Sequence, residues 1–194
     1  MIKFEQLTEG VYDPNIFKAI FLAGGPGSGK SYVAGKTIRG EGLKVVNSDD
    51  AFESLLKKAG LSLQMPDKEA DLRDPVRTRA KKLTAKKQAN YIEGRLGLII
   101  DGTAREYDKI ARQSNDLKQL GYDTYMVFVN TSLDVALERN AKRPRKVPEP
   151  SLTRSWKAVQ SNIGKFSLHF RQGFIVVDNN DAKENLMPPI IKIV

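Results

Sequence analysis

The sequence predicts a three-layer α/β fold in which a central parallel sheet of about five strands is covered by helices on both faces. Short apolar runs alternate with longer amphipathic segments, and no repeat or flexible linker divides the 194 residues. Such alternation implies right-handed βαβ crossovers, which place a binding site at the carboxyl edge of the sheet. We therefore expect one domain spanning residues 1–194.

Five apolar runs rich in Val, Ile, Leu or aromatic residues are the expected buried strands. They cover residues 18–23, 43–47, 96–101, 124–130 and 174–178. Helical patterns lie between them, over residues 29–39, 50–59, 75–94, 107–120, 132–139 and 150–166. The polar motifs considered below follow the ends of these strands, so we expect them to meet at one edge of the sheet.

Composition narrows the chemistry. The formal charge of +9 favours a polyanionic partner such as nucleic acid, although it also serves solubility. Without cysteine there is no disulfide, thiolate nucleophile or cysteine-bound zinc, and a single histidine, His169, cannot build a multi-histidine metal site. No run of about 18 apolar residues and no signal-like N-terminus occurs. We expect a protein of the cytoplasm with no membrane partner, either a monomer or a small homo-oligomer.

The first strand is followed by GGPGSGKS, which fits the phosphate-loop pattern G-x-x-x-x-G-K-[ST] between a strand and a helix. Glycines let backbone N–H groups point inward, and the helix N-terminus adds a positive dipole. Lys30 is expected to reach the β- and γ-phosphates of a nucleoside triphosphate, and Ser31 to help hold Mg²⁺. The alternative is a glycine-rich tight turn. The expected nucleotide contacts are Gly25, Pro26, Gly27, Ser28, Gly29, Lys30, Ser31 and Tyr32.

The second strand leads into NSDDAFESLL, which places Asp49 and Asp50 at a strand-to-helix corner. One of these carboxylates is suited to accept the proton of an attacking hydroxyl group. The other interpretation is an ordinary helix N-cap, and the two roles can be divided between the neighbours. The pattern alone leaves both open.

The third strand, in GLIIDGTA, ends at Asp101. A carboxylate at this position is suited to lie near Mg²⁺ and its waters, and Thr103 adds a hydroxyl group. Because Asp-Gly is also a strong turn signal, a plain strand-end turn is the alternative.

A basic segment, LERNAKRPRKVPEP, follows the fifth helical pattern. Its cationic side chains repel one another until a polyphosphate neutralises them, which predicts a lid over about residues 139–150. One arginine of this lid would stabilise negative charge in the transition state. A solvated basic loop is the bland alternative. The cations are Arg139, Lys142, Arg143, Arg145 and Lys146.

In this order and spacing, GGPGSGKS, VVNSDD, IIDGT, RNAKRPRKVP and SWKAVQ resemble the 5′-hydroxyl kinase domain of phage polynucleotide kinase. They are also similar to a wider group of small P-loop kinases, including zeta-toxin-like sugar kinases and phage enzymes that phosphorylate hydroxymethyl pyrimidines in DNA modification. The resemblance covers roughly residues 17–166. It implies that Asp49 is the general base, that Arg143 contacts the transferring phosphate, and that Asp101 is the family's acidic residue after the third strand. Arg139 would stack against the nucleotide base.

The sequence departs from polynucleotide kinases at two points. Those enzymes carry an arginine three positions after the general base, where this chain has Phe52. This weakens the assignment to polynucleotide 5′ ends. The chain also ends too soon for a 3′-phosphatase domain, so we expect the phosphoryl transfer chemistry alone.

Substrate contacts are expected from the helical stretch between the second and third strands, where seven basic residues could bind nucleic-acid phosphates or simply form a solvated face. Arg77 and Arg79 are the preferred substrate contacts there, beside Asp50 and Thr103. Near the C-terminus, Asn179 is expected to approach adenine. His169 is interpreted as a packed structural residue. The seven residues are Arg73, Arg77, Arg79, Lys81, Lys82, Lys86 and Lys87.

Together these patterns predict a kinase that uses ATP and Mg²⁺ to phosphorylate a hydroxyl group of a nucleic acid, nucleotide or nucleoside. If phage-encoded, it would act in the host cytoplasm. A nucleotide-sugar kinase is the nearest alternative. A nucleic-acid-binding module that uses ATP as a switch is another, although a switch needs neither an acceptor carboxylate nor a lid arginine.

Overall fold

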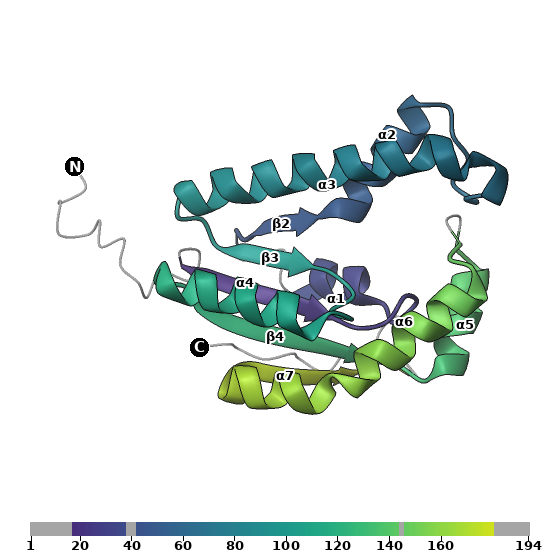
Figure 1. Cartoon of the computed structure of the whole chain (residues 1–194). Helices are drawn as coiled ribbons and strands as arrows, with labels where there is room; N and C mark the ends of the chain where they lie inside the picture. The colour runs from purple at the N-terminus through teal and green to yellow at the C-terminus, as the bar shows by residue number, and fades with distance from the viewer. Residues whose placement is uncertain (1–16, 38–41, 144–145, 181–194) are drawn as a thin grey trace.

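The computed structural model describes residues 17–37, 42–143 and 146–180, and Figure 1 shows their arrangement. Five strands form one sheet: β1 (Lys18–Ala23), β2 (Lys44–Asn47), β3 (Leu98–Asp101), β4 (Asp123–Asn130) and β5 (Phe174–Asp178). Their order is β2-β3-β1-β4-β5, and every neighbouring pair is parallel. The predicted five-stranded parallel sheet is confirmed.

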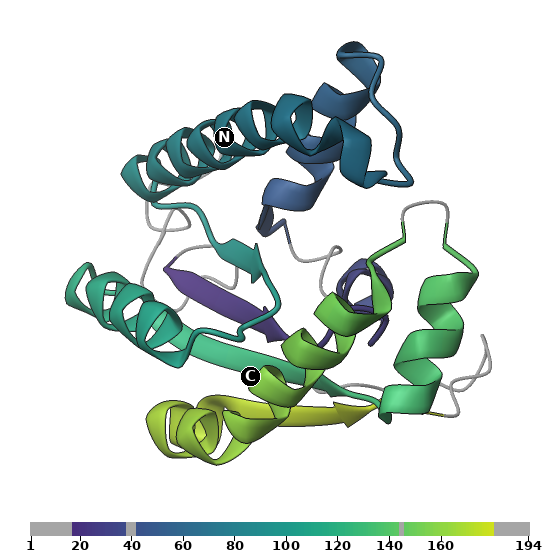
Figure 2. The ribbon, with the colours of Figure 1, turned by 45° about the vertical axis from the view of Figure 1, so that its right-hand side comes forward.

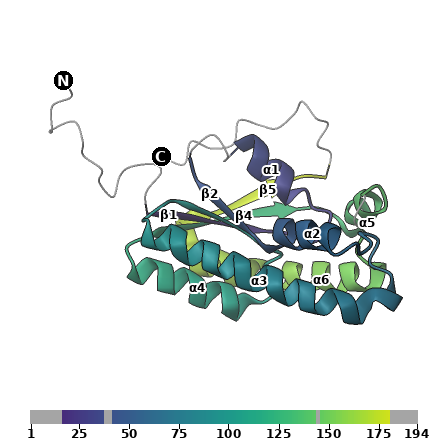
Figure 3. The same cartoon turned by 90° about the horizontal axis from the view of Figure 1, so that it is seen from above.

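The strands are buried on both faces because their apolar residues point alternately to opposite sides. In β1, Ala19 and Phe21 join one core cluster, whereas Ile20 and Leu22 join the other. The first cluster includes residues of helices α4 (Tyr107–Gln119), α6 (Glu149–Ser161) and α7 (Ile163–Phe170). The second includes Val33 of α1 (Lys30–Thr37). Figure 3 shows these two helical layers on opposite sides of the sheet.

A helical pair lies beside β2 and extends past the carboxyl ends of β2 and β3 (Figure 1). It consists of α2 (Ser48–Lys58) and the long helix α3 (Ala70–Glu93), joined through the short 3₁₀ turn η3 (Asp67–Glu69). Phe52, Leu56 and Ala80 form a separate apolar cluster between the two helices. The N-terminal half of α3 extends past the arrowheads of β2 and β3, opposite α5 (Leu133–Ala141) and α6 (Figures 1 and 2).

Two predicted helix boundaries were wrong. The helix expected over residues 75–94 begins at Ala70, so Pro75 lies inside it. In its first turn, the Arg73 guanidinium donates to the Pro66 carbonyl oxygen at 3.3 Å. The helix expected over residues 150–166 is divided into α6 and α7 at Asn162. The Asn162 side chain turns inward and donates to the Arg105 carbonyl oxygen at 2.9 Å. Tertiary contacts decided both boundaries.

Candidate active site

The loop between β1 and α1 is shaped by glycines with positive φ angles, +84° at Gly27 and +88° at Gly29. A Cβ atom on Gly27 would collide with the Ala136 carbonyl oxygen of α5, and one on Gly29 would collide with the Asn179 side chain. Both the backbone conformation and the close neighbours therefore require glycine. The loop ends at the N-terminus of α1, where the first N–H groups lack intrahelical acceptors and favour an anion.

Neighbouring elements brace this loop from outside. The Trp156 indole of α6 lies against Gly25 and donates its Nε1 hydrogen to the Thr131 carbonyl oxygen at 2.9 Å. The Asn179 side chain, just after β5, donates to the Ser28 carbonyl oxygen at 2.7 Å. The segment SWKAVQ contributes to the family resemblance, but nothing in it indicated that Trp156 contacts the loop. It assigned Asn179 to adenine, whereas its buried amide binds the loop backbone; direct adenine contact stays a prediction.

Arg139 lies beside the same loop, within the last turn of α5. One guanidinium nitrogen, Nη2, donates to the Asn180 carbonyl oxygen at 3.4 Å. The other, Nη1, is buried next to Gly29 and has no hydrogen-bond partner among the described residues. A buried donor without a partner is costly, so this nitrogen is suited to bind an anion held by the loop.

Lys30 lies at the start of α1 and reaches back across the loop. Its Nζ donates to the carbonyl oxygens of Gly24 at 2.7 Å and Gly25 at 3.0 Å. Burial lowers the pKa of Lys30 to about 8, because desolvation penalises the ammonium form. At neutral pH most Lys30 side chains therefore still carry their positive charge, and this charge lies where the loop would hold a phosphate.

Asn47 and Asp101 occupy paired positions at the ends of β2 and β3. The Asn47 side chain donates to Asp101 Oδ2 at 3.0 Å and accepts a hydrogen bond from the Asp49 backbone N–H at 2.7 Å. Asn47 is thus the N-cap of α2, so neither Asp49 nor Asp50 has the cap role considered from the sequence. This role of Asn47 was not predicted from the sequence. The available signal was that Asn is a residue type that favours N-caps and that it directly precedes SDD.

Five charged groups from four segments act on one another at this edge. Burial raises the pKa of the Asp101 carboxyl, the Lys30 ammonium lowers it, and Asp49 and Asp50 raise it again. Asp101, Arg143 and Asp49, in that order of size, also influence the pKa of Lys30. Lys30, Asp49, Asp101 and Arg143 therefore lie within electrostatic range of one another at this edge, and their catalytic roles stay predictions.

The connection between α5 and α6, where the sequence predicts a lid over about residues 139–150, is shorter than expected because α5 continues to Ala141 and α6 begins at Glu149. The buried Asn140 side chain joins both ends of this connection. Its Nδ2 donates to the Val147 carbonyl oxygen at 2.8 Å, and its Oδ1 accepts from the Val147 N–H at 2.9 Å. Lys142 forms an ion pair with Glu138, so the basic cluster is not free of acidic partners as the sequence suggested. Arg145 lies outside the described residues.

The predicted acceptor contacts come from three parts of the fold, α3, the end of β3 and the start of α2. Arg77 of α3 places its guanidinium carbon 4.8 Å from the centre of the Phe52 ring. Arg79, two residues further along α3, points to a different side of that helix. Thr103 contacts the phosphate loop through its backbone, whose carbonyl oxygen accepts from the Gly24 N–H at 3.5 Å. Asp50 is exposed and accepts from Asn47 Nδ2, also at 3.5 Å.

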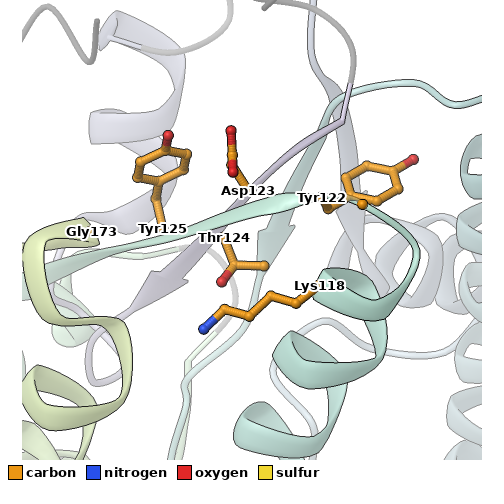
Figure 4. A pocket seen from close by; sticks show the side chains of 7 residues that line it. Lys118, Tyr122, Asp123, Thr124, Tyr125 and Gly173 are labelled. Carbon is orange, nitrogen blue, oxygen red and sulfur yellow. The ribbon is translucent and has the colours of Figure 1, made fainter. Parts of the chain in front are cut away.

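Two further observations concern ligands. Among the described residues, no group of three or more acidic or histidine side chains is arranged to hold a metal ion. A cavity of about 440 Å³ lies at the opposite, amino-terminal end of β4 (Figure 4), away from the phosphate loop. It is lined by Lys118, Gly121, Tyr122, Asp123, Thr124, Tyr125 and Gly173.

His169 is half-buried on α7, in the helical layer that also contains α4 and α6. Its ring packs against Phe170, with centroids 4.8 Å apart, and edge-on to Tyr107 at 6.3 Å. Burial lowers its pKa, in keeping with a neutral packed ring. The predicted structural role of His169 is confirmed.

The family model for zeta toxin matches residues 12–187. The chain belongs to the zeta-toxin family. This match and the similar solved structures described below confirm the predicted P-loop kinase fold. No curated protein matches its sequence.

Three solved structures show the same fold at low sequence identity. A candidate kinase from Chloroflexus aurantiacus has a TM-score of 0.57 at 16% identity, covering 89% of this chain and 90% of its own. The AvrRxo1-ORF1:ORF2 complex with ATP has a TM-score of 0.62 at 18% identity, covering 84% and 55%. The Pnkp1/Rnl/Hen1 RNA repair complex has a TM-score of 0.58 at 23% identity, covering 78% and 46%. This zeta-toxin family chain thus spans about half the length of the last two.

One negative observation completes the comparison with the sequence. Within residues 17–37, 42–143 and 146–180, no helix of the zeta-toxin family chain combines the length and apolar character needed to cross a bilayer.

Proposed function

We propose that this protein is a kinase that transfers the γ-phosphate of ATP to a hydroxyl group of a nucleic acid, nucleotide or nucleoside, of the polynucleotide 5′-OH or hydroxymethyl-pyrimidine type. The observation that carries the proposal is that Lys30 Nζ lies within the phosphate loop while Asp101, Arg143 and Asp49 are near enough to act on its pKa. A phosphate-binding loop alone would bind a nucleotide. A carboxylate and an arginine facing it from α2 and the lid supply what phosphoryl transfer needs.

In the proposed reaction, the acceptor oxygen forms a bond to the γ-phosphorus while the bond to the bridging β,γ-oxygen breaks. Asp49 accepts the hydroxyl proton, and ADP leaves with the electron pair of the broken bond. Lys30 and Arg143 stabilise the negative charge of the transferring group. Asn47 positions Asp49 by fixing the first turn of α2.

The oxygen donors near the loop fit Mg²⁺, which prefers one or two carboxylates together with phosphates and waters. Ser31 is exposed at the start of α1, and Asp101 is held at the end of β3 by Asn47. These two residues would hold the ion. When bound, Mg²⁺ would neutralise part of the phosphate charge and orient the phosphates.

An acceptor panel tests the proposal. Purified protein is incubated with γ-labelled ATP and, separately, with a 5′-hydroxyl oligonucleotide, a hydroxymethyl-pyrimidine nucleotide, a nucleoside and a nucleotide sugar. We expect label on one of the first three and none without an acceptor. Label confined to the nucleotide sugar would overturn the proposed acceptor class and establish the nucleotide-sugar alternative that the sequence resemblance offered.

A second alternative, a nucleic-acid-binding module that uses ATP only as a switch, is favoured by the formal charge of +9. It predicts salt-sensitive binding of nucleic acid without acceptor-dependent consumption of ATP. The same panel identifies it, because no acceptor would then receive label although oligonucleotides bind.

ATP binding should take up protons near pH 8. The pKa of Lys30 is lowered from 10.5 to about 8, so in roughly half of the protein molecules the Lys30 side chain is neutral at pH 8. Phosphates favour the ammonium form and raise this pKa on binding. We expect uptake of roughly half a proton per ATP at pH 8 and weaker affinity as the pH rises from 7 to 9. Titration calorimetry without Mg²⁺, in two buffers of different ionisation enthalpy, measures the uptake.

The matched variant for this measurement is Lys30→Met, which should bind ATP weakly and without proton uptake. Uptake that persists in Lys30→Met would assign the titrating group elsewhere.

A further inference from the structure

The seven basic side chains of α3 lie on different sides of one helix. Between Pro75 and Ile92 the helix contains no acidic residue, and Ala80 is its only buried residue among those described. No ion pair joins these cations to any residue in the described part of the chain. Which of them face the active site is decided by the direction in which α3 packs.

Gln88 marks the side of α3 that faces the body of the protein, because it accepts a hydrogen bond from Gln113 of α4 at 3.3 Å. Arg77 and Lys81 precede it by eleven and seven residues, which places them within about 20° of the same direction around the helix. Lys82 and Lys86 lie about 120° to 160° away. Arg77 and Lys81 therefore form a row, here called the inner row, on the Gln88 side of α3.

The inner row belongs to the half of α3 that extends beyond α4 and stands opposite α5 and α6 (Figures 1 and 2). Arg77 is held there by its contact with the Phe52 ring, which is only 1% exposed. Phe52 lies one helical turn after Asp49 on α2. The guanidinium thus packs against the helix that carries the carboxylate proposed to receive the acceptor hydroxyl.

Two cations four residues apart on a helix repel each other, which costs a few tenths of a kcal/mol until an anion lies between them. Their positions are about 6 Å apart along the helix axis. The two phosphates of a diphosphate share one bridging oxygen, whereas successive phosphates of a nucleic-acid strand are separated by a sugar. The spacing of the inner row favours the strand.

We propose that the acceptor is a nucleic-acid strand whose backbone phosphates bind Arg77 and Lys81 while its hydroxyl group faces Asp49. This inference rests on the proposed kinase function and narrows its substrate class. Phosphate contacts of this kind confer affinity without base preference.

The test compares two double variants of the same helix, Arg77→Glu/Lys81→Glu and Lys82→Glu/Lys86→Glu, which change the net charge equally. Binding of a 12-nucleotide single-stranded oligonucleotide with a 5′-hydroxyl is measured by fluorescence anisotropy from 50 to 200 mM salt. Loss of two phosphate contacts should reduce the slope of log K against log salt by about 1.4. We expect this reduction, with at least a tenfold lower kcat/KM for the oligonucleotide, in the inner-row variant alone.

Equal losses in both variants would overturn the inference, because they would reflect overall charge. An inner-row variant with wild-type slope and transfer would overturn it as well. Arg77→Gln/Lys81→Gln, checked for helical content by circular dichroism, covers the case in which glutamate disturbs the packing against Phe52. If the wild-type protein transfers no phosphate to any acceptor, the kinase function itself fails; if it labels only a nucleotide sugar, the kinase stands and this inference fails.

Discussion

Asp49→Asn is expected to lower kcat by about 10²- to 10⁴-fold while leaving ATP affinity within about twofold. Asparagine preserves the size of the side chain but cannot accept the hydroxyl proton. The N-cap hydrogen bond from the Asp49 backbone N–H to Asn47 does not depend on the side chain, so α2 should begin unchanged. Single-turnover transfer of labelled phosphate, together with ATP binding by titration, measures the two quantities separately.

Asp50→Asn is the matched control, because the neighbouring carboxylate carries the same charge in the same first turn of α2. Asp50 is exposed, and we expect its loss to raise the KM of the acceptor rather than lower kcat. Full transfer by Asp49→Asn would remove Asp49 from the base role, and a kcat loss found only in Asp50→Asn would move that role to its neighbour.

Arg143→Ala is expected to lower kcat by about 10³-fold or more, since an arginine that stabilises the transferring phosphate contributes on this scale. The Arg143 charge already acts on Lys30 and Asp101, although its side chain is exposed on the lid. Lys142→Ala removes an adjacent cation that is paired with Glu138, and should change kcat little. Steady-state kinetics with saturating ATP compares the two variants, and similar losses in both would show that the lid acts only through its overall charge.

A variant of Asn140 tests whether the catalytic effect of Arg143 depends on the structure of the segment that carries it. Asn140→Ala removes the two hydrogen bonds to Val147 that join the ends of the predicted lid, so the backbone that carries Arg143 should be held less firmly. We expect a reduced kcat in Asn140→Ala and no further reduction when it is added to Arg143→Ala. Additive losses in the double variant would mean that Asn140 stabilises the fold without positioning Arg143.

The strands and the phosphate loop could be predicted because their signals are local. Apolar runs such as KAIFLA predict buried strands, and GGPGSGKS between a strand and a helix predicts a phosphate-binding loop. Asp49 and Asp101 were placed near one another because parallel strands direct their carboxyl ends to a common edge, and Arg143 was added from the basic segment and the family resemblance. Each of these predictions requires only the chain direction and the side-chain pattern.

The sequence by itself thus determined the layer architecture, the phosphate loop and the set of charges expected at the edge of the sheet. The tertiary structure decided that Asn47 rather than an aspartate caps α2, that Trp156 and Asn179 brace the loop, and that α3 begins before Pro75. The physical reason is that Trp156 and Asn179 donate to residues 25 and 151 positions away, across distances that no local pattern encodes. The Asn47 cap is a local contact, but its sequence signal stood beside two aspartates that favour the same role.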